Sequence, residues 1–136
     1  MSKVLKLTFL IHAVVGLLLG VPLLIIPGRF LWWMGWQAML QAVNWQNTDP
    51  LMARVMGAVL LALAWSSFRG WRATERAQVA ILVEMEVIFT VLGCVGLLRH
   101  LLVWVVIGGW YPAIGWIAFA ILAIFAVAWI VSLLKK

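Results

Sequence analysis

The residues best able to do chemistry in this sequence are a few ionisable side chains set inside long apolar segments. They are His12, Arg54, Glu84 and Glu86. An ionisable group at membrane depth is energetically costly, and such groups often mark ligand, ion or proton sites. The competing interpretation is structural, because paired polar groups can fix the register of packed helices without doing chemistry. Both interpretations stay open from the sequence.

His12 and Glu84 are expected at a similar depth. Counting about 1.5 Å of rise per residue from the nearest basic residues, His12 lies roughly 9 Å and Glu84 roughly 12 Å inside the same membrane boundary. Ser66 and Ser67, near the end of the second apolar segment, lie slightly closer to that boundary, and Ser66 is taken as the candidate for the site. A cluster of histidine, carboxylate and hydroxyl is therefore geometrically feasible at this level.

The two glutamates point in different directions. Two residues apart on a helix, Glu84 and Glu86 are separated by about 200° and cannot form a paired carboxylate site. Glu86 shares its face with Thr90 and Gly93, which are residue types common at contacts between membrane helices. We expect Glu86 in the protein interior, within reach of Arg54 from the opposite boundary. Glu84 then faces another helix, faces a partner protein, or stays protonated.

No arrangement of residues predicts a catalytic or metal centre. The sequence lacks a phosphate-binding loop, a nucleophile elbow and a Cys/His cluster. His12 and His100 are expected near opposite membrane boundaries, so they cannot both ligate one haem within a chain. A quinone, a lipid or a pigment remains open as a ligand, the last through His12 shared with a partner. Whether the protein is an enzyme is left open.

Composition assigns the chain to the membrane. Of its 136 residues, 67% are hydrophobic and 10% are charged, and the mean hydropathy is +1.15. Soluble domains are about 45–50% apolar and about 25% charged. The net charge of +6 does not indicate nucleic acid, because the basic residues stand at the ends of apolar segments. This placement is typical of anchoring to anionic lipid headgroups.

Four apolar segments approach the roughly 20 residues that a helix needs to cross a bilayer. The sequence therefore predicts an all-α fold, a four-helix transmembrane bundle that forms a single domain over residues 1–136. The expected helices cover residues 4–26, 51–68, 77–98 and 112–134. Thr74 is expected to cap the third.

Basic residues predict the orientation. With four crossings, the boundary shared by both termini holds seven of the ten Lys and Arg residues, and the opposite boundary holds Arg29, Arg54 and Arg99. Lys and Arg favour the cytoplasmic side of a membrane protein. Both termini are therefore predicted to be cytoplasmic.

The connections on the opposite boundary are rich in tryptophan. Apolar and polar residues alternate at helical spacing over residues 31–45, which predicts a short helix lying in the membrane interface. The segment 101–107 is expected to be an apolar cap. These tryptophans are interpreted as an aromatic belt or as a docking surface for a partner or pigment. They are Trp32, Trp33, Trp36, Trp45, Trp104 and Trp110.

One segment resembles a known family. In the run from Asp49 to Ala64, the spacing of Arg54 and Gly57-Ala58 is similar to an Arg-x-x-Gly-Ala segment that opens the second of four helices in small DoxX-like membrane proteins. The resemblance implies a four-helix protein of the bacterial inner membrane. It also implies accessory membrane subunits or quinone-coupled oxidation as functions.

Three functions are consistent with these observations. The first is an accessory or assembly subunit of a larger membrane complex or homo-oligomer, favoured by the lack of a catalytic constellation. The second is a binder or transporter of a small hydrophobic ligand such as a quinone or lipid, favoured by the buried ionisable groups. The third, a subunit of a quinone-linked oxidoreductase, depends mostly on the resemblance.

Overall fold

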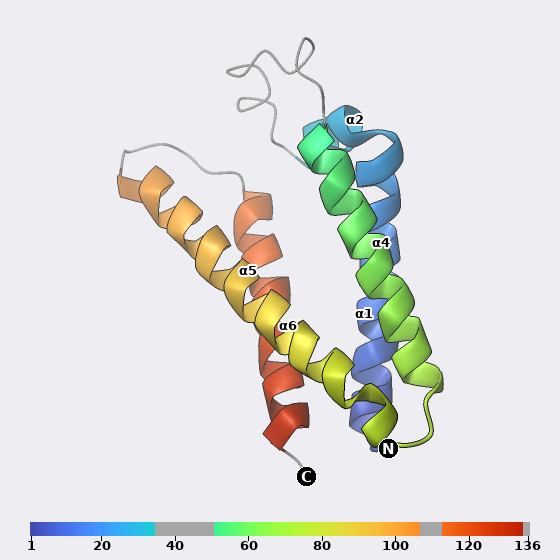
Figure 1. Cartoon of the computed structure of the whole chain (residues 1–136). Coiled ribbons are helices and arrows are strands. Elements are labelled where there is room, and N and C mark those ends of the chain that lie inside the picture. Colours follow the sequence, from blue (N-terminus) through green and yellow to red (C-terminus); the bar gives the residue numbers. More distant parts are fainter. Residues whose placement is uncertain (35–50, 107–112, 135–136) are drawn as a thin grey trace. The chain divides into compact units, whose positions relative to one another are not determined.

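The computed structural model describes residues 1–34, 51–106 and 113–134 of the chain. Within these residues it is helical throughout, apart from short connections (Figure 1). Four helices in these described ranges are long and apolar enough to cross a membrane. The prediction of an all-α membrane protein with four spanning helices is confirmed, and the chain is a multi-pass integral membrane protein.

The spanning helices are close to the expected segments at their starts. Helix α1 covers Lys3–Ile25, α4 covers Leu51–Arg72, and α6 covers Ala113–Leu134. Helix α5 covers Ala80–Val106 and follows a short 3-10 turn, η2, at Ala77–Val79. Helix α1 continues past Pro22 without interruption.

Two helices extend beyond their predicted ends. Helix α4 continues through the basic run to Arg72, and α5 continues past Arg99 and His100 to Val106. Residues 101–106 of the segment expected to be an apolar cap therefore belong to the last turns of α5. Hydropathy locates the membrane boundary, whereas Arg, Leu and Trp are all compatible with a helix that continues past it.

Thr74 does not cap the third spanning helix. The residue before η2 is Arg76, which makes no side-chain capping hydrogen bond. The backbone carbonyl of Thr74 instead accepts a hydrogen bond of 3.3 Å from the backbone nitrogen of Met1. The start of this helix is therefore set without the expected hydroxyl cap.

A short helix follows α1 at Pro27–Trp33 and is labelled α2. It begins after Ile26, whose φ of −129° and ψ of 52° end α1. Proline suits the first turn of a helix because its fixed φ is helical and its missing N–H would have no partner there. The predicted interfacial helix over residues 31–45 overlaps α2 only at its start, and residues 35–45 lie outside the described ranges.

The chain divides into two compact units. One contains Phe9–Arg69, and the other contains Met1–Thr8 together with Gly70–Lys136. The prediction of a single domain over residues 1–136 stays a prediction.

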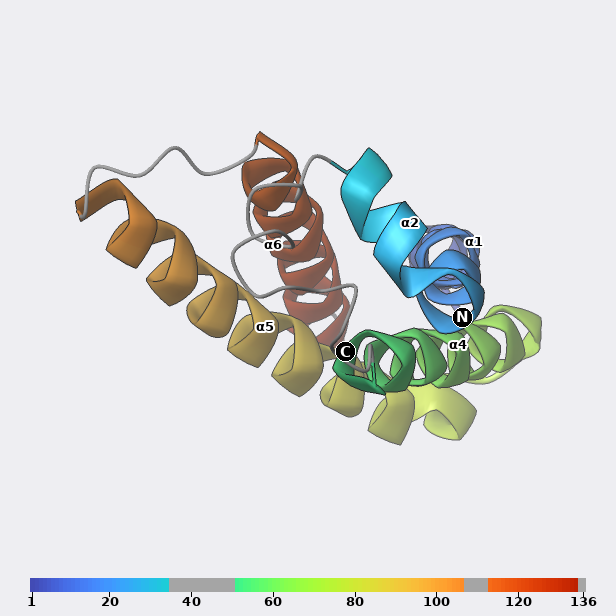
Figure 2. The same ribbon diagram turned by 90° about the horizontal axis from the view of Figure 1, so that it is seen from above.

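In the unit Phe9–Arg69, α1 and α4 run antiparallel (Figure 1) and lie side by side, as Figure 2 shows with α1 viewed end on. A Cβ atom built on Gly16 would lie 2.9 Å from the Cβ of Ala64, and one on Gly57 would lie 2.7 Å from the backbone nitrogen of Leu24. Gly20 meets Gly57 and Leu61 between these points. Small residues at such a contact let two membrane helices approach closely and gain van der Waals packing.

In the other unit, α5 packs against α6. The contact passes close to Gly93, where an added Cβ would lie 3.5 Å from a side-chain atom of Leu122. Phe125, Ala126 and Trp129 of α6 are buried, and Trp129 is the largest fully buried side chain among the described residues. Helix α6 therefore presents an aromatic face to the protein interior.

Candidate functional site

His12 lies at the contact between α1 and α4. It is 6% exposed, and a hydrogen bond of 2.8 Å joins its Nδ1 to the Oγ of Ser67, which is fully buried. The pair continues the antiparallel register in which Gly16 meets Ala64. Either atom can donate, because neutral histidine has two tautomers and a hydroxyl both donates and accepts.

The hydroxyl beside His12 comes from Ser67 and not from Ser66. Ser66 Oγ donates to the carbonyl of Leu63 within its own helix, at 2.8 Å. Both serines stand at the predicted end of the second span, but the 100° step between them directs only Ser67 towards α1. Sequence reasoning chose Ser66 as the candidate; the small residues Gly16 and Ala64, one turn away on the same faces, were the signal that favours Ser67.

Glu86 and Thr90 lie on the buried face of α5. Glu86 is 1% exposed and Thr90 is fully buried. Thr90 Oγ1 donates to the backbone carbonyl of Glu86 at 2.6 Å. Val79 and Val83 continue this buried face toward the start of the helix. A buried carboxyl on such a face requires polar partners, because desolvating it alone is costly.

Glu84 lies on the opposite, exposed face of the same helix. Its neighbours there are large apolar residues, Ile81, Met85 and Ile88, of which Ile88 is 60% exposed. We call Ile81, Glu84, Met85, Ile88 and Leu92 the Glu84 face. It combines a hydrophobic surface suited to lipid with one carboxyl group that is not.

Two of the predicted side-chain pairs take one residue from each compact unit. Arg54 is an exposed residue in the first turn of α4 and belongs to one unit, whereas Glu86 belongs to the other. The same division separates His12 from Glu84. The Arg54–Glu86 pair and a carboxylate beside His12 and Ser67 stay predictions.

Of the six tryptophans assigned to a belt or docking surface, two have described side chains. Trp32 and Trp33 of α2 are both exposed. Trp104 lies within α5, and the remaining three, Trp36, Trp45 and Trp110, lie outside the described residues. Exposed tryptophan near the end of a spanning helix is typical of the membrane interface.

The described residues do not gather metal ligands. Among residues 1–34, 51–106 and 113–134, no three His, Cys, Asp or Glu side chains lie together as a metal site would require. Some of the sequence-predicted polar residues find a polar neighbour, in a histidine–serine pair in one unit and a glutamate–threonine turn in the other. Such arrangements can bind through hydrogen bonds or fix helix register.

Replacing Ser67 with alanine should lower the free energy of unfolding by about 1 kcal/mol, since the buried His12 ring loses a polar partner. Ser66→Ala is the matched control. It removes the neighbouring hydroxyl, which donates to the carbonyl of Leu63 within α4. This variant should change the free energy of unfolding by less than about 0.5 kcal/mol. Titration with sodium dodecyl sulfate, followed by circular dichroism in mild detergent, measures both. Equal losses in the two variants would show that the His12–Ser67 bond contributes nothing specific.

Comparison with known proteins gives no relative from which a function could be transferred. No family model, no curated protein and no solved structure matches the chain.

Proposed function

We propose that this protein is a non-enzymatic accessory or assembly subunit of a larger membrane complex. The observation that carries the proposal is the exposed carboxyl group of Glu84 on a membrane-spanning helix. An acidic residue at the centre of a spanning helix costs about 2.5–3.5 kcal/mol to place in lipid, and Glu84, in the second turn of α5, carries part of that cost. A partner helix that donates a hydrogen bond or a positive charge to this carboxyl would remove most of that cost.

The shape of the surrounding surface supports a helical partner. The Glu84 face repeats every three or four residues along α5 and is apolar apart from the carboxyl. A polar residue within an apolar interface specifies one register and one partner, because any other pairing leaves it unsatisfied. The preferred partner is therefore a membrane helix with Arg, Lys, Asn, Gln or Ser opposite Glu84.

The test is the size of the complex that contains the chain in its own membrane. Gentle detergent extraction followed by native mass spectrometry should retrieve the wild-type chain with a stoichiometric partner. Glu84→Leu should release it, because the partner's polar group would lose its acceptor. Glu75→Leu is the matched control: Glu75 is exposed, lies between α4 and η2 outside the spanning helices, and should leave the complex intact.

Each outcome separates the hypotheses. A complex of identical chains would make the partner a second copy. Recovery of the wild-type chain alone, with no bound protein, would refute an accessory role. If a quinone or lipid co-purifies with the wild-type chain and is lost in Glu84→Leu while the partner stays bound, the alternative of a hydrophobic-ligand binder is favoured.

Location and kinship are part of the same proposal. We infer the bacterial inner membrane from the resemblance to DoxX-like proteins, and the cytoplasmic position of both termini from the unequal distribution of Lys and Arg. A fluorescent-protein fusion after residue 136 should then be fluorescent, and a fusion that stays dark would reverse the orientation. The proposal of a DoxX-like origin depends on the spacing of Arg54 and Gly57-Ala58 in the sequence.

A further inference from the structure

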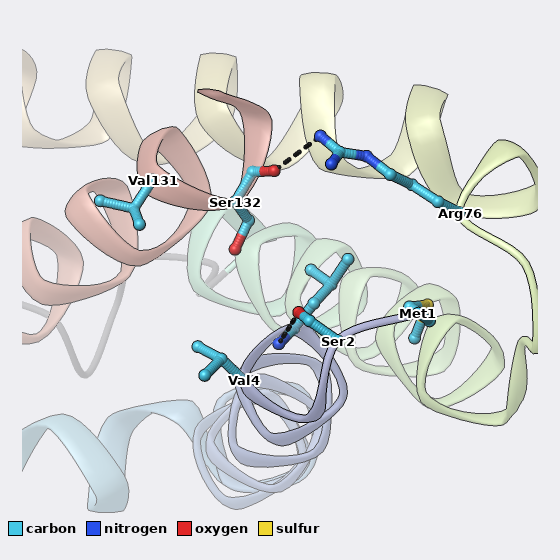
Figure 3. A pocket seen from close by; sticks show the side chains of 7 residues that line it. Met1, Ser2, Val4, Arg76, Val131 and Ser132 are labelled. Atoms are coloured by element: carbon cyan, nitrogen blue, oxygen red, sulfur yellow. Dashed lines mark hydrogen bonds between the residues drawn. The ribbon is translucent and has the colours of Figure 1, made fainter. Parts of the chain in front are cut away.

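A pocket of about 270 Å³ lies in the unit formed by Met1–Thr8 and Gly70–Lys136 (Figure 3). The first turn of α1, the segment before η2 and the last turns of α6 form its walls. Apolar side chains such as Val4 and Val131 line part of it, and Arg76 and Ser132 supply polar groups. Because these segments are the ends of membrane-spanning helices, the pocket lies at the level where lipid headgroups begin.

The guanidinium group of Arg76 is held in place at this pocket. Its Nη2 donates to the backbone carbonyls of Ser132 at 2.8 Å and Leu133 at 3.1 Å. A positive charge at the last carbonyls of a helix is favourable, since the helix dipole places partial negative charge there. These two bonds use one nitrogen of a group with five N–H donors, so the remaining donors can serve an anion.

The start of α1 adds a second favourable feature. The hydroxyl of Ser2 accepts a hydrogen bond of 3.2 Å from the backbone N–H of Leu5 and so caps the helix (Figure 3). The positive end of the α1 dipole therefore faces the same pocket whose wall includes Arg76. A helix start alone would not define a site, but here it converges with a fixed guanidinium.

We propose that this pocket binds the phosphate group of an anionic phospholipid. Arginine recognises phosphate through two parallel N–H···O bonds, which a point charge cannot do. The apolar walls suit the glycerol and the first methylenes of a lipid, and Val4 at 61% exposed extends this surface outward. The volume lies just below the range of about 300–1,000 Å³ typical of whole-ligand pockets, which fits a headgroup whose acyl chains stay in the bilayer.

Charge around the pocket favours a net negative ligand over a zwitterionic one. Lys3 and Lys6 lie in the first turns of α1, in the same unit as Arg76. Glu75, the acidic residue beside Arg76 in sequence, is exposed and outside the pocket lining. Each Lys or Arg near a membrane surface adds about 1 kcal/mol of attraction to anionic lipid.

Titration of the purified full-length protein with phosphatidylglycerol or phosphatidylcholine, read by native mass spectrometry, tests the proposal. The wild-type protein should bind one phosphatidylglycerol about tenfold more tightly than phosphatidylcholine, because both lipids offer a phosphate to Arg76 but only phosphatidylcholine brings a choline cation close to the basic residues. Arg76→Gln should abolish this preference. Arg99→Gln removes the same charge from an exposed position in α5 and should preserve it.

A second variant covers the case in which Arg76→Gln fails to fold. Val131→Trp keeps Arg76 but fills the pocket from a partly exposed position, and it should also abolish the preference while circular dichroism stays unchanged. Equal losses in Arg76→Gln and Arg99→Gln would overturn the proposal in favour of net charge. Displacement of phosphatidylglycerol by equimolar inorganic phosphate would overturn the lipid as the source of the phosphate group.

Discussion

Replacing Gly57 with alanine should destabilise the protein, although the same change stabilises most helices. The added Cβ would lie 2.7 Å from the backbone nitrogen of Leu24 and 2.9 Å from the carbonyl oxygen of Gly20. Backbone atoms cannot rotate away as a side chain can, so α1 and α4 must separate. Overpacking of this kind costs about 1–3 kcal/mol. Denaturation in detergent followed by circular dichroism measures the change.

Gly96→Ala is the matched control for Gly57→Ala. Gly96 also lies inside a spanning helix, but a Cβ there would meet nothing within 4 Å. Alanine should therefore leave stability unchanged or raise it by up to about 1 kcal/mol through its better helix propensity. Opposite signs for the two variants identify close helix approach as the cause. If both variants changed the free energy of unfolding in the same direction, the close approach of α1 and α4 at Gly57 would be contradicted.

Trp129→Ala should lower the free energy of unfolding more than Ser67→Ala, Gly57→Ala or Trp65→Ala. Trp129 is 0% exposed and is the largest fully buried side chain among the described residues. Removing a buried aromatic side chain leaves a cavity and costs about 3–5 kcal/mol. In a membrane protein most of that cost is lost van der Waals contact, since lipid is as apolar as the interior. Hydrogen exchange should increase first in α6 and in its neighbour α5.

Trp65→Ala separates this effect from a general need for tryptophan. Trp65 of α4 is 64% exposed and contacts Phe68 with ring centroids 5.9 Å apart. An exposed aromatic pair contributes about 0.5–1.5 kcal/mol, so the loss should be well below that at Trp129. If the two variants lost equal stability, the loss in Trp129→Ala could not be attributed to the packing around its buried side chain.

The spanning helices could be predicted because length and apolarity are imposed by the bilayer. Helix ends were less predictable, as the continuation of α4 to Arg72 and of α5 to Val106 shows. Charged or polar residues end the hydrocarbon layer without ending the hydrogen-bond ladder of a helix. The start of α2 at Pro27 was also hard to predict, because a Pro-Gly pair that ends one helix can begin the next.

The separation of Glu84 from Glu86 follows from helical periodicity alone. What periodicity did not supply was the direction in which each face points, since that depends on the neighbouring helix. The choice between Ser66 and Ser67 illustrates this, because two adjacent hydroxyls differ only in which of them faces α1. Gly16 and Gly20 form a Gly-x-x-x-Gly pair, and this pattern indicates which face of α1 packs against another helix.

The hydrogen bonds of Arg76 also have a consequence for how the chain is made. Arg76 precedes its acceptors Ser132 and Leu133 by 56 and 57 residues. At synthesis rates of about 5–20 residues per second, that interval lasts roughly 3–11 s. During it, the start of α5 has entered the insertion machinery while the carbonyls that hold its arginine do not yet exist. The last spanning helix therefore completes the attachment of the third, and α5 and α6 should mature as a single late hairpin.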